Sequence, residues 1–317
     1  MKIIGTGSAI PSKVVTNDML SEFLDTSDEW IVPRTGIRSR HVISSEELED
    51  LGTEACRKAL DMSGLGPQDI DYFICSNVVN EYATPGLSCV IGAGLGLQCP
   101  CIDINCACPG FIYAMDIAEA QYRAGRVKNV LIVCCEEPTR MCDWTDRSTC
   151  VLFGDGGAAA VLGEGNDLLS INLTATGNDA AIRIPHGTNS SPFYEHEEER
   201  AVLHMAGNEV YKFATAAMAN GIKKAVEDAG LQQSDIDCVI PHQANIRIIN
   251  TAEKNLDIPR EKFFCNVQHY GNTSSASVVI ALDEANRGGV LKKGDLVAMC
   301  AFGGGLTTGS CIIRWNK

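Results

Sequence analysis

The fold is decided by one stretch, Cys101–Gly125, which reads CIDINCACPGFIYAMDIAEAQYRAG. Its apolar opening, Ile102–Ile104, predicts a buried strand that ends just before a turn. From Pro109 onward, apolar residues recur at helical spacing, and Gly125 suits the position just past a helix end. The sequence therefore predicts a sharp strand-to-helix turn with Cys108 at the helix N-cap.

A cysteine in this position is a candidate nucleophile. The first N–H groups of a helix lack acceptors, and the helix dipole favours negative charge beside them. We therefore expect the pKa of the Cys108 thiol to be lowered and its thiolate to be the attacking species. The alternative is that Cys108 is a small buried apolar side chain, as most cysteines are. This stretch alone does not separate the two.

Length and cysteine content suggest a cytoplasmic, reduced protein. The 317 residues suffice for two domains or one large two-lobed unit, and no apolar run is long enough for a signal peptide or a membrane span. The fifteen cysteines are odd in number and mostly lie inside apolar runs. We therefore expect free thiols rather than a disulfide framework.

Charge and cysteine spacing argue against several ligand classes. The net charge of −14 and the pI of about 4.9 disfavour nucleic acid and anionic membranes as partners. Cys99, Cys101, Cys106 and Cys108 fall within ten residues, but the C-x-C spacing is tighter than that of zinc sites. We therefore expect no metal.

An internal repeat organises the chain. Gly64–Asp71 (GLGPQDID) and Gly230–Asp237 (GLQQSDID) match in register at an offset of 166 residues, each after a predicted helix and before an apolar strand. A duplicated α/β unit explains this order, with two lobes, residues 1–165 and 166–317, packed about a pseudo-twofold axis. Strand ends of the two lobes should then meet in the middle.

The repeat brings further polar residues to the same centre. A predicted strand ending at Pro241 is followed by His242, and another is predicted to end near Val267. Asn272 lies in the turn that corresponds to the Cys108 turn. A single histidine after a strand is more often structural, but Cys108, His242 and Asn272 together at equivalent strand ends favour a catalytic centre.

Three other stretches give weaker expectations. Residues 84–97 are apolar and rich in glycine, so we expect an exposed adhesive patch on a monomer. Residues 149–162 suggest a pair of strands punctuated by glycine. The polar residues 177–200 suggest a solvated loop or lid.

Segments along nearly the whole chain resemble those of the β-ketoacyl-acyl carrier protein synthase III family, condensing enzymes of the thiolase fold that start fatty-acid synthesis. The matching segments are IIGTGSAIP at 3–11, DTSDEWIVPRTGIRSRH at 25–41, the cysteine turn at 103–111, DRSTCVLFGDGGAAAVL at 146–162, GNEVYK at 207–212, PHQANIRI at 241–248, YGNTSSAS at 270–277 and AFGGGLTTGS at 301–310. The resemblance implies an α/β protein with a duplicated thiolase-like fold, its lobes layered α-β-α-β-α.

The resemblance also implies a mechanism. Cys108 would accept an acyl group from acyl-CoA, with the amides of Cys108 and of one glycine of 303–305, which we take as Gly304, forming an oxyanion hole. Malonyl-acyl carrier protein would then lose CO2 while His242 and Asn272 donate hydrogen bonds to its thioester oxygen. No cofactor is implied beyond the CoA thioester substrate.

Binding residues follow from the same resemblance. Trp30, Arg34, Arg147 and Asn245 would contact CoA, and Lys212 and Arg247 would dock the acidic carrier protein. The resemblance further implies a homodimer in which Thr84, near Pro85, gates the acyl pocket across the interface. A small threonine there would admit primers longer or more branched than acetyl.

Other functions stay open. Pro109, which has no N–H, and Cys106 stand where this family usually has small residues, so a related acyltransferase or a condensing enzyme of specialised metabolism is an alternative. The order Cys108, His242, Asn272 also imitates papain-like cysteine hydrolases, although their local signature around the cysteine is absent.

Overall fold

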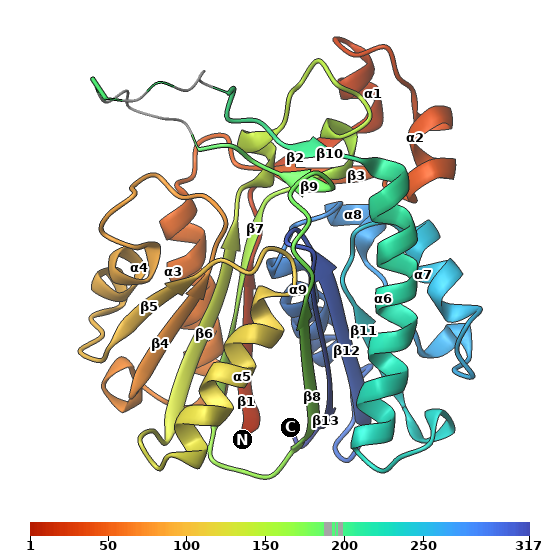
Figure 1. Ribbon diagram of the computed structural model, residues 1–317. Coiled ribbons are helices and arrows are strands. Elements are labelled where there is room, and N and C mark those ends of the chain that lie inside the picture. The colour runs from red at the N-terminus through yellow and green to blue at the C-terminus, as the bar shows by residue number, and fades with distance from the viewer. Residues whose placement is uncertain (187–191, 194, 196–198) are drawn as a thin grey trace.

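Two β-sheets stand side by side in the computed structural model, with helices between them and on both outer faces (Figure 1). The structure describes residues 1–186, 192, 193, 195 and 199–317. All strands of the first sheet fall within residues 2–163, and all strands of the second fall within residues 168–314.

The first sheet has five strands, in the order β1-β7-β6-β4-β5. Its strands are β1 (Lys2–Ala9), β4 (Tyr72–Ser76), β5 (Cys101–Ile104), β6 (Asn129–Glu136) and β7 (Gly156–Gly163). β4 runs parallel to β5 and β6, whereas β7 is antiparallel to β6 and β1.

The second sheet repeats this arrangement with four strands, in the order β11-β12-β13-β8. Its strands are β8 (Leu168–Ala175), β11 (Cys238–Pro241), β12 (Leu296–Gly303) and β13 (Thr307–Arg314). β11 and β12 are parallel, and β13 is antiparallel to β12 and β8.

Helices complete five layers, which confirms the α-β-α-β-α prediction. The helices are α3 (Leu48–Ser63) and α4 (Leu87–Leu95) outside the first sheet, α5 (Gly110–Arg123) and α9 (Ala276–Arg287) between the sheets, and α6 (Gly207–Asp228) and α7 (Ile246–Glu253) on the outer side of the second (Figure 1). α9 is buried on nearly all sides, and α5 turns its apolar side to the core between the sheets, as Phe111, Met115 and Ile280 illustrate.

The sequence repeat corresponds to a structural one. α3 and α6 are each followed by a glycine with positive φ, Gly64 at 77° and Gly230 at 68°. In the short turn that follows, the carboxylate of Asp69 or Asp235 accepts a backbone N–H at 2.8 Å, and β4 or β11 begins shortly afterwards. The predicted duplication is therefore confirmed.

One predicted strand is wrong. The chain before Val267 makes a single parallel bridge, between Phe263 and Val239, where the first lobe has all of β5. The additional residues between Phe263 and Asn272 form the short helix α8 (Val267–Tyr270) and Gly271 instead of a strand end. The turn containing Asn272 nevertheless returns to the equivalent position.

Two weaker expectations also need correction. Residues 149–162 are not a strand pair: a single turn of 3-10 helix, Cys150–Leu152, precedes the one strand β7. The apolar residues of 84–97 are not an exposed patch. Leu87, Ile91 and Leu95 recur at helical spacing on α4, and this face is buried in the first lobe.

Short elements cover one end of both sheets, at the top of Figure 1. They are α1 (Asn17–Ser21), α2 (Asp28–Thr35) and the two-stranded sheets β2–β3 (Lys13–Thr16 with Ser39–Val42) and β9–β10 (Ile182–Arg183 with His204–Met205). The predicted loop at 177–200 thus contains β9, while residues 187–191, 194 and 196–198 lie outside the described residues.

The packing of β1 on α3 gives a test of the fold. At Gly7 an added Cβ would lie 2.5 Å from the Ala55 carbonyl oxygen and 2.6 Å from the Ala59 nitrogen, both rigid backbone atoms. We expect Gly7→Ala to lower the free energy of unfolding by about 1–3 kcal/mol, because α3 must shift to relieve the clash. Gly177→Ala, where an added Cβ meets nothing within 4 Å, is the matched control. Equal urea midpoints for the two variants would contradict this packing.

Candidate active site

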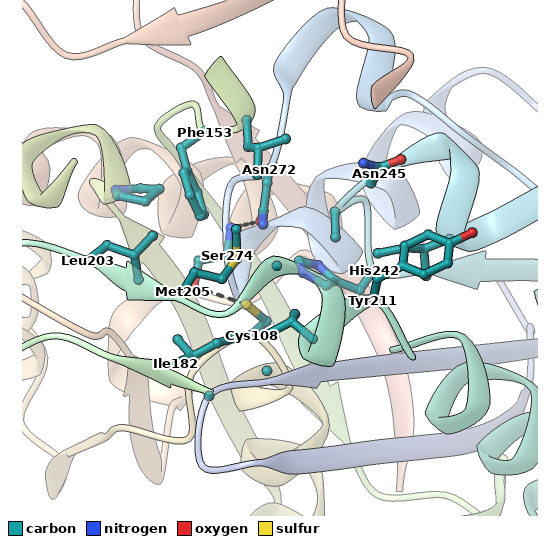
Figure 2. Close-up of a pocket in the computed structure, with 18 of the residues that line it drawn as sticks. Cys108, Phe153, Ile182, Leu203, Met205, Tyr211, His242, Asn245, Asn272 and Ser274 are labelled. Carbon is teal, nitrogen blue, oxygen red and sulfur yellow. Dashed lines mark hydrogen bonds between the residues drawn. The ribbon is translucent and has the colours of Figure 1, made fainter. Parts of the chain in front are cut away.

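A cavity of about 330 Å³ lies where the two lobes meet, and Cys108, His242 and Asn272 all line it (Figure 2). Its walls are otherwise largely apolar, with Phe153, Leu203 and Met205 among them. The structure therefore brings the three predicted reactive residues together, although they lie far apart in the sequence.

The Cys108 turn is held by close backbone approaches. β5 ends at Ile104, Ala107 adopts a left-handed conformation (φ 51°), and α5 begins at Gly110. A Cβ on Gly110 would lie 1.9 Å from the Ser76 hydroxyl, so only glycine lets the helix start here. Pro109 is the N-cap residue, which places Cys108 one position earlier than predicted.

The predicted lowering of the Cys108 pKa is wrong in sign. Burial raises the pKa of this thiol to about 12, opposed by a contact between Ser274 Oγ and Cys108 Sγ at 3.8 Å, while the nearby Glu136 raises it further. The partial exposure of Cys108 is toward the cavity. Removal from water therefore outweighs the helix N-terminus, and the resting residue is a thiol.

His242 follows β11 and is a neutral imidazole. Its Nδ1 lies 2.6 Å from Ser277 Oγ, and that oxygen also accepts the Gln243 N–H at 3.3 Å. Nδ1 is thus engaged by Ser277, and Nε2 is the ring nitrogen left for a ligand in the cavity. Burial lowers the pKa of His242 to about 3, so the ring acts as a neutral N–H donor.

Asn272 is fixed as a second donor. Its main chain exchanges hydrogen bonds with the Leu152 carbonyl (2.8 Å) and the Gly154 N–H (3.1 Å). Its side-chain Oδ1 accepts the Ser274 N–H at 2.9 Å, an arrangement seen in Figure 2. Because the carbonyl oxygen is occupied, the amide NH2 is the part of the side chain that can serve a ligand.

The predicted oxyanion hole lies against β12. A Cβ on Gly303 would fall 2.7 Å from the Cys108 nitrogen, so Gly303 must be glycine for the turn to pack here. Gly304, the predicted partner, is next to Ala107 and also lines the cavity. Among the described residues, neither the Cys108 nor the Gly304 N–H donates to a backbone carbonyl oxygen.

The mouth of the cavity carries the predicted CoA contacts. Trp30 lies on α2, whose N-cap Ser27 accepts the Trp30 N–H at 3.2 Å. The guanidinium carbons of Arg34 and Arg147 lie 4.6 and 5.0 Å from the centroid of the Trp30 ring. Trp30 and Arg34 line the cavity directly, and Arg147 reaches the mouth through Trp30.

The opposite side of the mouth is built from α6 and α7. Asn245 caps α7 by accepting the Arg247 N–H at 2.8 Å, and its amide donates to the Arg34 carbonyl at 3.0 Å. Arg247 is exposed, lines the cavity and lies 5.6 Å from the Tyr211 ring. Lys212 is exposed on the next position of α6.

Thr84 lies apart from these residues. It is exposed, three residues before α4 begins, and does not line this cavity of the single chain. Across the part of the chain that the structure describes, no group of three or more side chains is arranged to hold a metal ion. No described helix is long and apolar enough to cross a membrane.

Sequence reasoning missed four side chains that support the site. Ser274 and Ser277 contact Cys108 and His242, the Phe302 ring lies 5.3 Å from the His242 ring, and Glu136 is buried beside Ser274. An acidic residue that ends the apolar run NVLIVCCE was a signal for Glu136 that could have been noticed.

Comparisons with known proteins agree with this geometry. Two family profiles match, 3-oxoacyl-[acyl-carrier-protein (ACP)] synthase III at residues 102–177 and its C-terminal part at residues 226–315. A β-ketoacyl-[acyl-carrier-protein] synthase III of Clostridium acetobutylicum is 42% identical over 100% of this chain and 99% of its own.

Solved structures give the same result. The crystal structure of a 3-oxoacyl-[acyl-carrier-protein] synthase III from Aquifex aeolicus VF5 matches with a TM-score of 0.92 and 40% identity, covering 99% of each chain. A priming β-ketosynthase from the R1128 polyketide pathway also matches with a TM-score of 0.92, at 33% identity over 100% of this chain and 96% of that one.

The buried neutral imidazole predicts a pH dependence of stability. The pKa of His242 is lower in the folded protein than its ordinary value of 6.5, so its contribution to stability is complete above pH 6.5 and is lost as the pH falls. Relative to His242→Gln, the wild type should lose about 1.4 kcal/mol of unfolding free energy per pH unit between about pH 6 and pH 4. Chemical unfolding of both proteins at a series of pH values measures this difference. Parallel plots of unfolding free energy against pH would show that the His242 ring is charged or exposed in the folded protein.

Proposed function

Because the chain belongs to the 3-oxoacyl-[acyl-carrier-protein] synthase III family, we propose that it condenses an acyl-CoA primer with malonyl-acyl carrier protein, with loss of CO2, to start fatty-acid synthesis. One observation carries this proposal: a cysteine before a helix faces two neutral side-chain donors in a single apolar cavity.

In the first half-reaction, Cys108 takes the acyl group. The sulfur attacks the thioester carbon, and the negative charge that develops on the oxygen needs donors that are already in place. The N–H groups of Cys108 and Gly304 are such donors. Pro109 has no N–H to donate, so the hole depends on the N–H groups of Cys108 and Gly304.

In the second half-reaction, malonyl-acyl carrier protein loses CO2. The electrons of the broken C–C bond move into an enolate, whose oxygen accepts hydrogen bonds from His242 Nε2 and the Asn272 amide. The enolate carbon then attacks acyl-Cys108 and releases the β-ketoacyl product. Neutral donors suit this step because they stabilise a developing anion and cannot protonate the reactive carbon readily.

Substrates would enter by the mouth at Trp30. A cationic cluster of Arg34, Arg147 and Arg247 there suits the phosphates of CoA, and the Trp30 ring suits its adenine. Asn245 joins both sides of this mouth. Lys212 and Arg247, exposed beside it, provide a local positive surface on a protein of net charge −14, which an acidic carrier protein requires.

A condensing enzyme of specialised metabolism is the alternative within the same chemistry. The similarity of this chain to the priming β-ketosynthase of a polyketide pathway supports this alternative, because the two proteins share one fold. A papain-like hydrolase is not supported, since Cys108 contacts Ser274 and the Nδ1 of His242 is occupied by Ser277. We place the reaction in the cytoplasm, where all fifteen free thiols would persist.

We further propose a homodimer that pairs through β5. This strand is at the edge of its sheet, with half-buried Ile102 and Ile104, and an unpaired edge favours pairing with another chain. Asp103 of β5 accepts the N–H groups that start α4, at 2.6 and 2.7 Å, so the Thr84 segment lies close to this edge. The partner's copy of that segment would then approach the turn that holds Cys108.

The two donors predict a separation of the half-reactions. Changing His242 or Asn272 to Ala should slow malonyl decarboxylation by roughly 10²–10³-fold, because an enolate hydrogen bond is lost. Acylation of Cys108, followed by intact mass after incubation with a panel of acyl-CoAs, should change much less. Cys108→Ala is the control that loses the acyl adduct and condensation. Equal loss of both half-reactions in the donor variants would indicate a Cys–His hydrolase pairing instead.

The dimer predicts an effect of Thr84 on primer length. Replacing Thr84 with Phe should narrow the primer range toward acetyl, because a bulky ring from one subunit would shorten the acyl pocket of the other. Sedimentation should find a dimer, and relative acylation rates with acetyl-, butyryl- and branched acyl-CoAs measure the range. An active monomer at assay concentration, or an unchanged chain-length preference, would refute this assignment.

A further inference from the structure

The proposed function assigns no acceptor for the thiol proton of Cys108. Glu136 is a buried carboxylate that is linked to Cys108 through one serine hydroxyl. Glu136 ends β6 and is fully buried. Its Oε2 accepts the Val78 N–H at 3.0 Å. Its Oε1 accepts from the hydroxyls of Ser275, at 2.5 Å, and Ser274, at 3.1 Å.

Ser274 joins this carboxylate to the nucleophile. Its hydroxyl lies 3.1 Å from Glu136 and 3.8 Å from the Cys108 sulfur. A hydroxyl has one proton, and the carboxylate is the stronger acceptor, so the thiol of Cys108 is left to donate to Ser274 Oγ. The three groups thus form a continuous path, S–H to O–H to carboxylate.

Nothing cationic competes for the carboxylate. The titratable groups that face Glu136 are thiols, Cys134 and Cys135 on its own strand and Cys108 before α5. β4 and the residues after it present Ser76 and the Val78 N–H, and the start of α9 presents the two serines. Among the described residues, no lysine, arginine or histidine forms an ion pair with Glu136, and the main causes that lower its pKa are hydrogen bonds from Ser275, Val78 and Ser274.

We propose that Glu136 accepts the thiol proton of Cys108 through the hydroxyl of Ser274 as the bond between sulfur and the primer carbonyl forms. Glu136 acts through Ser274 and does not touch the primer. The identity of the substrate, an acyl-CoA primer, rests on the proposed function. The proton path rests on the distances between Cys108, Ser274 and Glu136. Transfer leaves a single negative charge between carboxylate and sulfur, which a dry site requires because two would repel.

The protons balance over a full cycle. During acylation the S–H bond breaks, Ser274 passes its own proton to Glu136 and receives that of Cys108, and CoA leaves as a thiolate that takes a proton from water. Glu136 stays neutral in the acyl-enzyme. When the enolate attacks and the Cys108 thiolate is expelled, the proton returns by the same path. The net reaction therefore consumes one proton from solvent, which is the one taken by the CoA thiolate during acylation.

Alkylation of Cys108 by iodoacetamide tests this path without any acyl-CoA. Burial raises the pKa of Glu136 to about 7, so the wild-type rate should rise with an inflection near pH 7 as the carboxylate ionises. Glu136→Gln and Ser274→Ala should lack that inflection and react at least about tenfold more slowly at pH 7.5. Peptide mapping assigns the label to Cys108 among the fifteen cysteines.

Two further variants make the result specific. Ser274→Thr keeps a hydroxyl and should restore the inflection. Ser275→Ala removes a donor to Glu136 but not the link to sulfur, so it should move the inflection to higher pH without removing it. Should Glu136→Gln fail to fold, the comparison of Ser274→Ala with Ser274→Thr still tests whether the proton path needs the hydroxyl at position 274.

An unchanged inflection and rate in Ser274→Ala, or in folded Glu136→Gln, would overturn the proposal. Acylation of Cys108 by acyl-CoA is measured separately. Normal alkylation profiles in a protein that no acyl-CoA can acylate would refute the proposed function and leave the proton path standing.

Discussion

A pair of left-handed turns, one in each lobe, fixes where Cys108 and Asn272 lie in this protein. Ala107 and Ser274 have φ angles of 51° and 53°, and neither is glycine. In each turn an asparagine two residues earlier, Asn105 or Asn272, accepts the N–H of the left-handed residue, at 3.3 and 2.9 Å. Such a conformation costs about 1–2 kcal/mol in a non-glycine residue, so the surrounding fold must hold it. The consequence is that α5 and α9 both begin at the lobe interface.

Duplication supplies two half-sites, of which one lines the cavity. After the left-handed residue, the first lobe has Cys108 and the second has Ser275. At the ends of the equivalent strands β4 and β11, the residues are Ser76 and His242. Ser76 and Ser275 are hydrogen-bonded to each other at 3.0 Å, so the second half-site is closed and holds Glu136 in place. The reactive half-site, with Cys108 and His242, faces the cavity instead.

Sequence reasoning succeeded where the signal is local or repeated. The strand, turn and helix at 101–125, the duplication, and the meeting of Cys108 with His242 all follow from periodicity and from one offset. The position of α8 could not be predicted from the sequence, because extra residues interrupt the repeat without changing its apolar pattern. The sign of the Cys108 pKa shift could not be predicted either. A helix N-terminus can be read from the sequence near Pro109, whereas the desolvation that outweighs it depends on packing against residues distant in the sequence, such as Ser274 and Gly303.

The electrostatics of the cavity follow from this burial. An apolar wall raises the cost of any charge, which keeps Cys108 a thiol and His242 neutral. In the proposed cycle the substrate brings one negative charge, the malonyl carboxylate. Decarboxylation moves this charge to the enolate oxygen and then to the sulfur of Cys108 without creating a second. Neutral donors and a carboxylate that is protonated during part of the cycle are therefore sufficient. A fixed cation at this depth would stabilise the negative charge on one of these groups, the carboxylate, the enolate oxygen or the sulfur. It would therefore slow the transfer of the charge to the next group.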